Sequence, residues 1–209
     1  MKNQSLKNSI EDLEELFAVL NDRYFDSDLV KPIITISPTT TKISGYGWCT
    51  AYKVWKDKDG GDGYFEINIC AEHLARPFSD VAATMLHEMV HLDNLMKGIK
   101  DTSRGGTYHN KRFKETAEAH GLLAGSTEKY GFSDTMLDDG ALAEVEDFMD
   151  FIDKTSFEIY RQAEAAPEKK GAGKSSSRKY VCPKCGMIIR ATKEVKVICA
   201  DCDELLIEQ

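Results

Sequence analysis

The sequence predicts an α+β protein with one helix-rich domain, a small antiparallel sheet and a short C-terminal module. Three observations favour this class. Apolar residues recur at helical spacing in four segments, others alternate with period two around a Gly/Asp-rich turn, and four of the six cysteines lie near the C-terminus behind a polar linker. A chain of 209 residues is long enough for one buried core and a small appendage. We expect a domain over residues 1–161, a flexible basic linker over 162–178 and a module over 179–209.

The N-terminal third of the chain predicts one helix followed by strands. Between about residues 9 and 24, apolar side chains recur on one helical face. The run IITIS, closed by Pro38, is typical of a short strand. The runs GYGWCTAYKVW and GYFEINIC each alternate with period two, and they are joined by KDKDGGDG, a turn by composition. Together these two runs predict an antiparallel hairpin.

The remainder of the first domain predicts three more helices. One begins near Ser79 or Asp80, either of which can cap its first turn. A Gly-containing loop leads into a helix over about 110–120 with Phe113 facing inward, and a polar, acidic stretch precedes a last long helix over about 141–161. The following residues are rich in Ala, Gly, Lys, Ser and Glu, which is typical of a flexible linker.

The second predicted helix carries the sequence HEMVH, from His87 to His91. Residues four apart project from nearly the same helical face, so both imidazoles can reach one metal ion, and imidazole nitrogen is a standard zinc ligand. Glu88 lies about 100° further around the helix, beside the metal, where its carboxylate can act as a general base toward water. This order predicts a hydrolytic zinc site. The alternative is an ordinary helix with two histidines at the edge of a core and a surface glutamate.

A third ligand is needed, because catalytic zinc sites usually have three protein ligands and one open position. The short-loop pattern HExxHxxGxxH is absent, since Asn94 and Lys97 occupy the positions of its Gly and last His. Spacing favours His109 modestly, because it lies where a Gly-rich loop enters the third predicted helix. The other downstream candidates are His120, Glu115 and Glu118.

Over about residues 10–122 the chain resembles the SprT/Spartan-like zinc metallopeptidase family. FAVLNDRYFDSDLVKPIITIS is similar to that family's first helix and strand, and GYFEINICAEHL to the strand and turn before its zinc helix. HEMVHL is similar to its helix motif, and HNKRFK to its third-ligand segment, usually written His-Gly-x-x-Phe. Here Asn110 replaces the Gly, and asparagine tolerates unusual backbone angles better than most residues.

The resemblance implies a zincin-like (SprT-like) fold in which His87, His91 and His109 bind a catalytic zinc ion and Glu88 is the catalytic residue. It implies a zinc-dependent endopeptidase that hydrolyses protein substrates. Eukaryotic members cleave proteins crosslinked to DNA, so DNA-associated substrates are an expectation by analogy. Zincin-type sites also lie beside an edge strand, and we expect residues 65–69 to belong to that sheet. The group that stabilises the oxyanion stays open among Tyr46, Arg104 and Tyr108.

The C-terminal module carries two CxxC pairs, Cys182 with Cys185 and Cys199 with Cys202, separated by thirteen residues. Four thiolates at this spacing suit a closed tetrahedral site for structural zinc, and the pattern resembles a zinc ribbon. The intervening residues alternate enough to predict a small hairpin. A module this short buries little core, so metal binding would supply most of its folding energy. The two remaining cysteines, at 49 and 70, are expected to be buried thiols.

Charge and composition limit the partners. The formal net charge of −8 disfavours indiscriminate coating of nucleic acid. The linker and module are locally rich in Lys and Arg, which can contact DNA phosphates or simply form a solvated surface. No run approaches the roughly 20 apolar residues of a membrane helix, and the N-terminus lacks a secretory signal, so we expect a cytoplasmic protein without membrane partners. The alternative function is a zinc-stabilised module that binds nucleic acid or protein, with an inactive peptidase-like domain. Another zinc hydrolase is a weaker alternative.

Overall fold

The computed structural model describes residues 5–39, 45–152, 154–162 and 177–209. The chain divides into two compact units, Met1–Gln162 and Ala163–Gln209. The predicted flexible linker falls largely on residues 163–176, which lie outside the described residues. Within the described ranges, no helix is both long and apolar enough to span a membrane.

The first unit combines helices with two small sheets, which confirms the predicted α+β class. Its described elements, in chain order, are α1 (Leu6–Phe25), β1 (Ile33–Ser37), β2 (Gly47–Cys49), β3 (Glu66–Cys70), the 3-10 turn η1 (Ala71–His73), α2 (Phe78–Met96), β4 (Thr102–Ser103), β5 (Tyr108–His109), α3 (Lys111–Ala119), β6 (Leu122–Thr127), β7 (Gly131–Leu137) and α4 (Asp139–Ile152).

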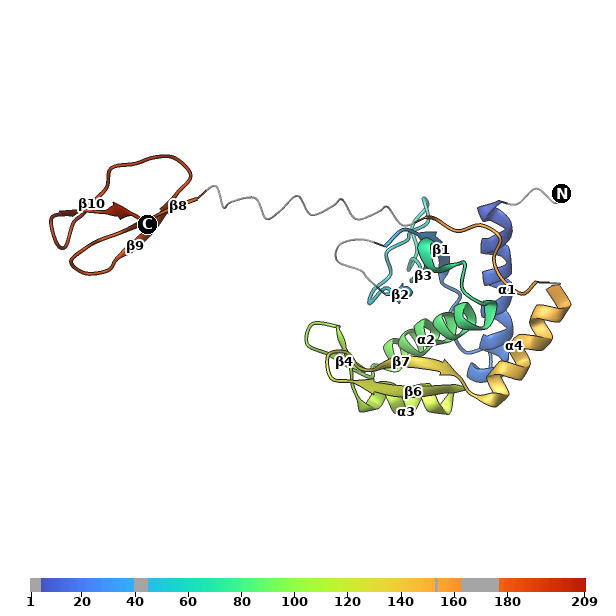
Figure 1. Cartoon of the computed structure of the whole chain (residues 1–209). Helices are drawn as coiled ribbons and strands as arrows, with labels where there is room; N and C mark the ends of the chain where they lie inside the picture. The colour runs from blue at the N-terminus through green and yellow to red at the C-terminus, as the bar shows by residue number, and fades with distance from the viewer. Residues whose placement is uncertain (1–4, 40–44, 153, 163–176) are drawn as a thin grey trace. The chain divides into compact units, whose positions relative to one another are not determined.

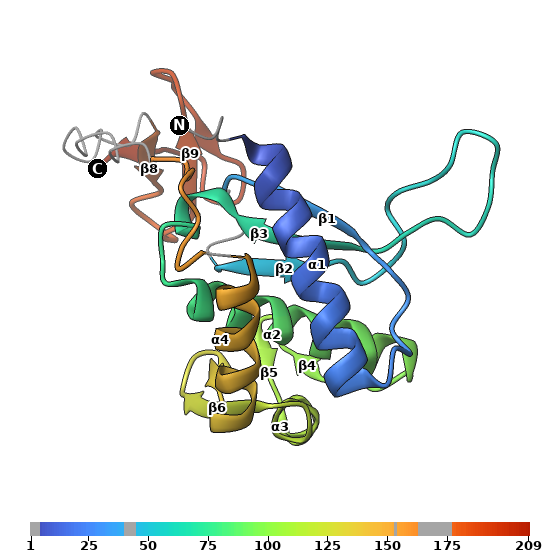
Figure 2. The same cartoon turned by 90° about the vertical axis from the view of Figure 1, so that its right-hand side faces the viewer.

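The first sheet has the strand order β1-β3-β2, with β3 at its centre. Strands β2 and β3 form the predicted antiparallel pair, in which Gly47 lies opposite Ile69. Strand β1 runs parallel to β3, so the expectation of a purely antiparallel sheet is wrong. The chain therefore has β1 and β2, which are neighbours in the sequence, at opposite edges of this sheet. Between β2 and β3 it projects as a long arm (Figure 2), which a bridge between Trp55 and Tyr64 closes.

The second sheet has the order β4-β5-β7-β6. Its main component is the antiparallel hairpin β6–β7, in the stretch where the sequence analysis expects only a polar segment. The burial pattern explains why the sequence does not predict this hairpin. The fully buried positions of these strands are Leu122, Gly131 and Leu137, at their ends, and the residues between them are exposed or only partly buried. Such strands lack the apolar alternation that predicts a half-buried sheet.

Helix α2 runs between the two sheets, α3 lies on the far side of the second sheet, and α1 and α4 lie to one side (Figure 1). Apolar side chains of α1, α2 and β3 meet in the core, among them Leu16, Met89 and Ile67, each 0% exposed. Because α2 is covered by both sheets and by helices, it is apolar around most of its circumference. This covered helix carries the HEMVH residues.

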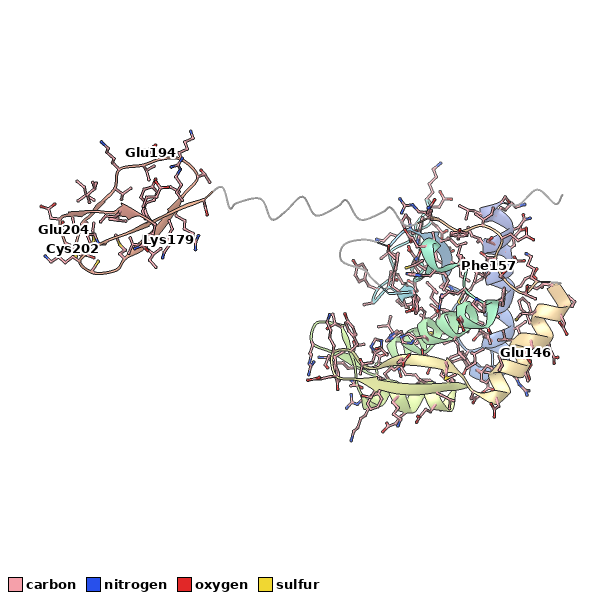
Figure 3. The ribbon with its side chains drawn as sticks, viewed as in Figure 1. Glu146, Phe157, Lys179, Glu194, Cys202 and Glu204 are labelled. Atoms are coloured by element: carbon pink, nitrogen blue, oxygen red, sulfur yellow. The ribbon has the colours of Figure 1, made fainter. Side chains whose placement is uncertain are left out.

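Helix α4 ends at Ile152, so the predicted extension to residue 161 is wrong. The chain instead turns back to the start of α2, where the N–H of Phe78 donates to the carbonyl of Thr155 at 3.0 Å. Phe157, labelled in Figure 3, stacks on Phe78 with ring centroids 5.1 Å apart. A hydrogen bond to an otherwise free helix N-terminus and a buried ring together favour this turn over further helix.

The second unit contains β8 (Arg178–Val181), β9 (Ile188–Ala191), β10 (Ile198–Cys199), β11 (Glu204–Leu205) and β12 (Ile207–Glu208). Strand β9 pairs with β8, and β10 pairs with β11. The predicted hairpin within residues 186–198 is therefore wrong, because its two strands pair with different partners. Each CxxC segment instead forms the turn of its own short hairpin, which brings two pairs of thiols together.

Candidate metal centres

Helix α2 supplies three of the four polar side chains at the centre of the first unit. His87 and His91 lie one turn apart, with ring centroids 5.0 Å from each other. Glu88 is on the next position of the same helix and is 6% exposed. The helix begins after Pro77, which cannot donate a backbone hydrogen bond, and it ends before Gly98, whose φ of 67° permits the turn that follows.

The fourth side chain, His109, comes from β5. Its Nε2 atom lies 3.1 Å from Nε2 of His87 and 3.0 Å from Nε2 of His91. Their ligand atoms all lie within 4.8 Å of one another, so the three histidines form a group that can hold a metal ion. The structure thus brings together the three histidines singled out in the sequence, although His109 lies 18 positions after His91.

The outward nitrogens of the three rings have oxygen partners. Nδ1 of His87 lies 2.9 Å from Oγ1 of Thr135, and Nδ1 of His91 lies 2.7 Å from Oδ2 of Asp101. Nδ1 of His109 faces the carbonyl oxygen of Tyr130 at 3.3 Å. The Asp101 carboxylate and the Tyr130 carbonyl can only accept, so they favour a proton on Nδ1 of His91 and His109, and the Nε2 atoms of all three rings face one point.

Three imidazole nitrogens that face one point at this spacing are suited to bind a cation between them. Tetrahedral ligands at the usual Zn–N length would be separated by about 3.3–3.4 Å, close to the 3.0 and 3.1 Å observed here. The donor set and its spacing therefore fit a zinc ion. Carboxylates and amides further out hold the donors in place, as is usual around metal-binding histidines.

Asp101 and Asn94 form the support of His91. The Asp101 carboxylate also accepts a hydrogen bond from Nδ2 of Asn94 at 3.2 Å, and Oδ1 of Asn94 accepts one from Thr116 at 2.9 Å. Asp101, Asn94 and Thr135 were missed by sequence reasoning. No local pattern marks them, because each reaches its partner only through the tertiary fold.

The segment HNKRF fixes His109 through two contacts. Asn110 is the N-cap of α3, where its side chain accepts a hydrogen bond from the N–H of Arg112 at 2.8 Å. Its φ of −90° is ordinary, so the substitution for glycine needs no unusual backbone angle. Four residues after His109, the buried ring of Phe113 lies beneath all three imidazoles, with centroids 4.6, 4.8 and 4.6 Å away.

Gly131 allows β7 to approach the backbone of His109. It lies opposite His109 in the β5–β7 pair, and its φ is 68°. A Cβ atom at this position would lie 2.0 Å from the carbonyl oxygen of His109. Only glycine fits here, since it lacks the side chain and tolerates a left-handed backbone.

Glu88 lies against β2 and outside the group of three histidines. A Cβ atom at Gly47 would be 3.3 Å from Oε1 of Glu88, which shows how closely the carboxylate approaches this strand. Burial raises the pKa of the Glu88 carboxyl to about 7, although His91 and the backbone N–H of Cys49 act in the opposite direction. A carboxyl with this pKa exchanges protons readily near neutral pH.

The three imidazoles differ in their protonation. Burial lowers the pKa of His87 well below its usual range and lowers that of His109 to about 4. Burial also acts to lower the pKa of His91, but the hydrogen bond to Asp101 and the charge of Glu88 outweigh it, and the net pKa is raised. His87 and His109 are therefore neutral near pH 7, the form that binds metals.

The histidines and Glu88 line a cleft of about 1570 Å³. Strand β2 forms one wall, β7 forms the other, and α2 lies between them. Of the three side chains considered for oxyanion stabilisation, Tyr46 lines this cleft. Arg104 lies over the ring of Tyr108 at 4.4 Å, and neither residue is part of the lining.

The other candidate ligands lie elsewhere. His120 stacks on Phe25, with centroids 4.4 Å apart, and its Nδ1 faces the carbonyl of Thr116. The fifth histidine of the chain, His73, which the sequence does not favour as a ligand, lies edge-on to Tyr46 in the cleft lining and belongs to no metal-binding group. Among the described residues, Glu115 and Glu118 belong to neither group that can hold a metal.

The second unit contains the other such group, formed by the cysteines at 182, 185, 199 and 202. The sulfurs of Cys185 and Cys199 are 3.7 Å apart, close to the roughly 3.8 Å that tetrahedral Zn–S geometry gives. Cys202 is labelled in Figure 3. The thiols pack with Tyr180 and Leu206, the two largest buried side chains of a very small core. The remaining cysteines lie apart, one half-buried in the cleft and one buried, at positions 49 and 70.

Comparisons with protein-family models, with curated proteins and with solved structures found no match to this chain.

Proposed function

We propose that the first unit is a zinc-dependent metalloendopeptidase of the zincin-like, SprT-like type. The observation that carries the proposal is the convergence of the Nε2 atoms of His87, His91 and His109 beside one buried carboxylate that is not part of the metal group. A hydrolytic zinc site usually contains three protein ligands and an adjacent carboxylate. The resemblance of the sequence motifs to the SprT/Spartan-like family supports the same conclusion.

A bound zinc ion supplies Lewis-acid chemistry, which activates water and polarises a carbonyl group. The chain's own residues perform the proton transfers. A carboxylate oxygen of Glu88 accepts the proton of the attacking water, and the same carboxyl group then donates it to the amine that leaves. Asp101 and Thr135 keep the imidazoles of His91 and His87 in the required orientation.

Strand β2 is suited to hold an extended peptide. It is the edge strand of the first sheet, it lines the cleft, and it lies against Glu88. An extended substrate can add to such an edge by backbone hydrogen bonds, which recognise peptide without demanding a particular sequence. Residues 65–69, which were expected to belong to this sheet, form its central strand β3 for most of their length, and β2 is the edge.

In the second unit we propose a structural zinc ion held by four thiolates in a ribbon-like fold. Its two CxxC turns supply a closed donor set, and a small core argues that the ion contributes much of the folding energy. DNA-associated proteins as substrates follow by analogy with the family.

The enzymatic proposal is tested with zinc-loaded full-length protein and an unfolded protein substrate such as reduced casein. We expect cleavage by the wild type and a loss of at least 100-fold in Glu88→Gln, because general acid–base catalysis contributes about 10²–10⁴-fold. Zinc content should be unchanged in this variant, since Glu88 is not a ligand. Equal activity of the two proteins, or no cleavage by either, would refute the proposal.

A further inference from the structure

Arg76 lies at one end of the cleft, just before α2, and it is held in a fixed position. Its Nε donates to the carbonyl of His73 at 3.0 Å, and its two terminal nitrogens donate to the carbonyl of Asp80 at 3.3 Å and to Oγ1 of Thr84 at 3.0 Å. The ring of Tyr46 covers it, 4.1 Å from Cζ. A guanidinium has five N–H groups, so these contacts leave two of them free to donate.

The partners of Arg76 are all neutral. Within the described part of the chain, no carboxylate forms an ion pair with it. The nearest acid along the helix, Asp80, is exposed and contacts Arg76 through its carbonyl oxygen, while its carboxylate acts on the guanidinium only from a distance, through its charge. A half-buried guanidinium without an ion pair is uncommon, because desolvating a charge that is not paired at close range is costly. The cleft therefore offers a preformed cation to whatever enters it.

Arg76 lies on the same side of the cleft as Glu88, the proposed catalytic residue. Thr84, which fixes one of its terminal nitrogens, lies one helical turn before Glu88, and the methyl group of Thr84 and Oε1 of Glu88 both flank Gly47. Tyr46 immediately precedes this glycine at the start of β2. A peptide paired with β2 would thus pass Glu88 and reach the Arg76 guanidinium within a few residues.

We propose that Arg76, with Tyr46 and His73 around it, forms a subsite that binds a carboxylate of the peptide substrate. The proposal rests on the peptidase function proposed above and names its substrate preference. The carboxylate can come from an acidic side chain or from the C-terminus of the peptide, and both suit the planar, two-pronged donor that Arg presents. Arg76 is a specificity residue in this account, with no part in the proton transfers.

The test measures binding rather than cleavage. Zinc-loaded Glu88→Gln protein, which is catalytically silent, is used to select ligands from a random decapeptide library with free C-termini and from the same library with amidated C-termini. Selected peptides are then resynthesised with Glu or Gln at the enriched position, or with a free or amidated C-terminus, and titrated by fluorescence anisotropy. We expect the carboxylate form to bind about 10-fold more tightly, in line with a hydrogen bond to a charged group.

Three further substitutions in the same background assign the preference. Arg76→Gln should abolish the preference for the carboxylate peptide. Arg76→Lys should retain part of this preference, since the positive charge remains but the planar pair of N–H donors is lost. Lys100→Gln is the matched control, because it removes another positive charge from the cleft lining and should leave the preference intact. The thermal unfolding temperature and the zinc content of each variant are measured to check that the fold is kept. If Arg76→Gln unfolds, the reduced preference expected of Arg76→Lys still tests the proposal.

The outcomes separate the hypotheses. Persistence of the preference in amidated peptides identifies an acidic side chain, and its disappearance identifies the C-terminal carboxylate. Absence of any carboxylate preference, absence of peptide binding, or a preference that survives Arg76→Gln would overturn the proposal. Because no step of this assay requires hydrolysis, failure of the wild type to cleave casein would refute the peptidase function separately.

Discussion

Gly131 controls the position of His109, and its replacement by alanine tests whether that position holds the metal. The added Cβ atom would lie 2.0 Å from the carbonyl oxygen of His109, whereas real Cβ atoms essentially never approach closer than 3.0 Å. The difference, 3.0 − 2.0 Å, means that β5 and β7 must separate by about 1.0 Å. Functional sites tolerate displacements of about 0.5 Å. The Nε2 atom of His109 therefore leaves its present place.

Two effects lower the free energy of unfolding of Gly131→Ala. A left-handed backbone costs alanine about 1–2 kcal/mol, and overpacking costs typically about 1–3 kcal/mol. The free energy of unfolding should fall by about 2–5 kcal/mol, the sum of these two ranges. Zinc affinity at the histidine site should fall at least 10-fold, because even changes in the groups that support a ligand cost about 10–100-fold.

The assay is a zinc titration against a competing chromophoric chelator, in a Cys182→Ser background so that the histidine site alone is measured. Gly105→Ala is the matched control. Its φ is 69°, nearly that of Gly131, but a Cβ atom there has nothing within 4 Å. The control should lose stability modestly and keep its zinc affinity. Equal zinc affinity in Gly131→Ala and Gly105→Ala would refute the reasoning.

Further predictions concern the groups around each metal. Asp101→Ala removes the acceptor of His91, and Thr135→Val removes that of His87 with little change in shape. Each should weaken zinc binding at the histidine site about 10–100-fold in the same competition assay, and unchanged affinity in both would contradict the assigned supports. Cys182→Ser should unfold the second unit, seen as collapse of its NMR amide dispersion, while the amide signals of the first unit persist, because the two units are compact separately. Loss of both sets of signals would show that the units depend on each other.

The parts of the site that lie on one helix could be predicted from the sequence. His87, Glu88 and His91 are close in the chain, so helix geometry alone fixes their arrangement. The fold class and the predicted pairing of β2 with β3 rest on similarly local patterns and agree with the structure. His109 needed the resemblance to a known family, because its spacing from the helix is compatible with several ligands.

Other features depend on contacts between distant segments. The partner of His87 is Thr135, on a hairpin whose buried positions lie near its ends, so no periodic signal marks it. The parallel pairing of β1 with β3 requires a crossover that composition does not reveal. Helix α4 stops early because Phe157 and the carbonyl of Thr155 make better contacts at the start of α2 than a longer helix would offer. In the first two cases tertiary contacts create an arrangement that no local pattern marks, and in the third they override the local preference for helix.

The content of zinc per chain, measured by mass spectrometry of the metal after dialysis against a weak chelator, tests the central claim most directly. The wild type should retain two ions, and the His109→Ala and Cys199→Ser variants should retain one each, because each loses a donor from a different group. If His109→Ala retained two ions at wild-type affinity, the third imidazole would not be a ligand, and the hydrolytic site built on it would be contradicted.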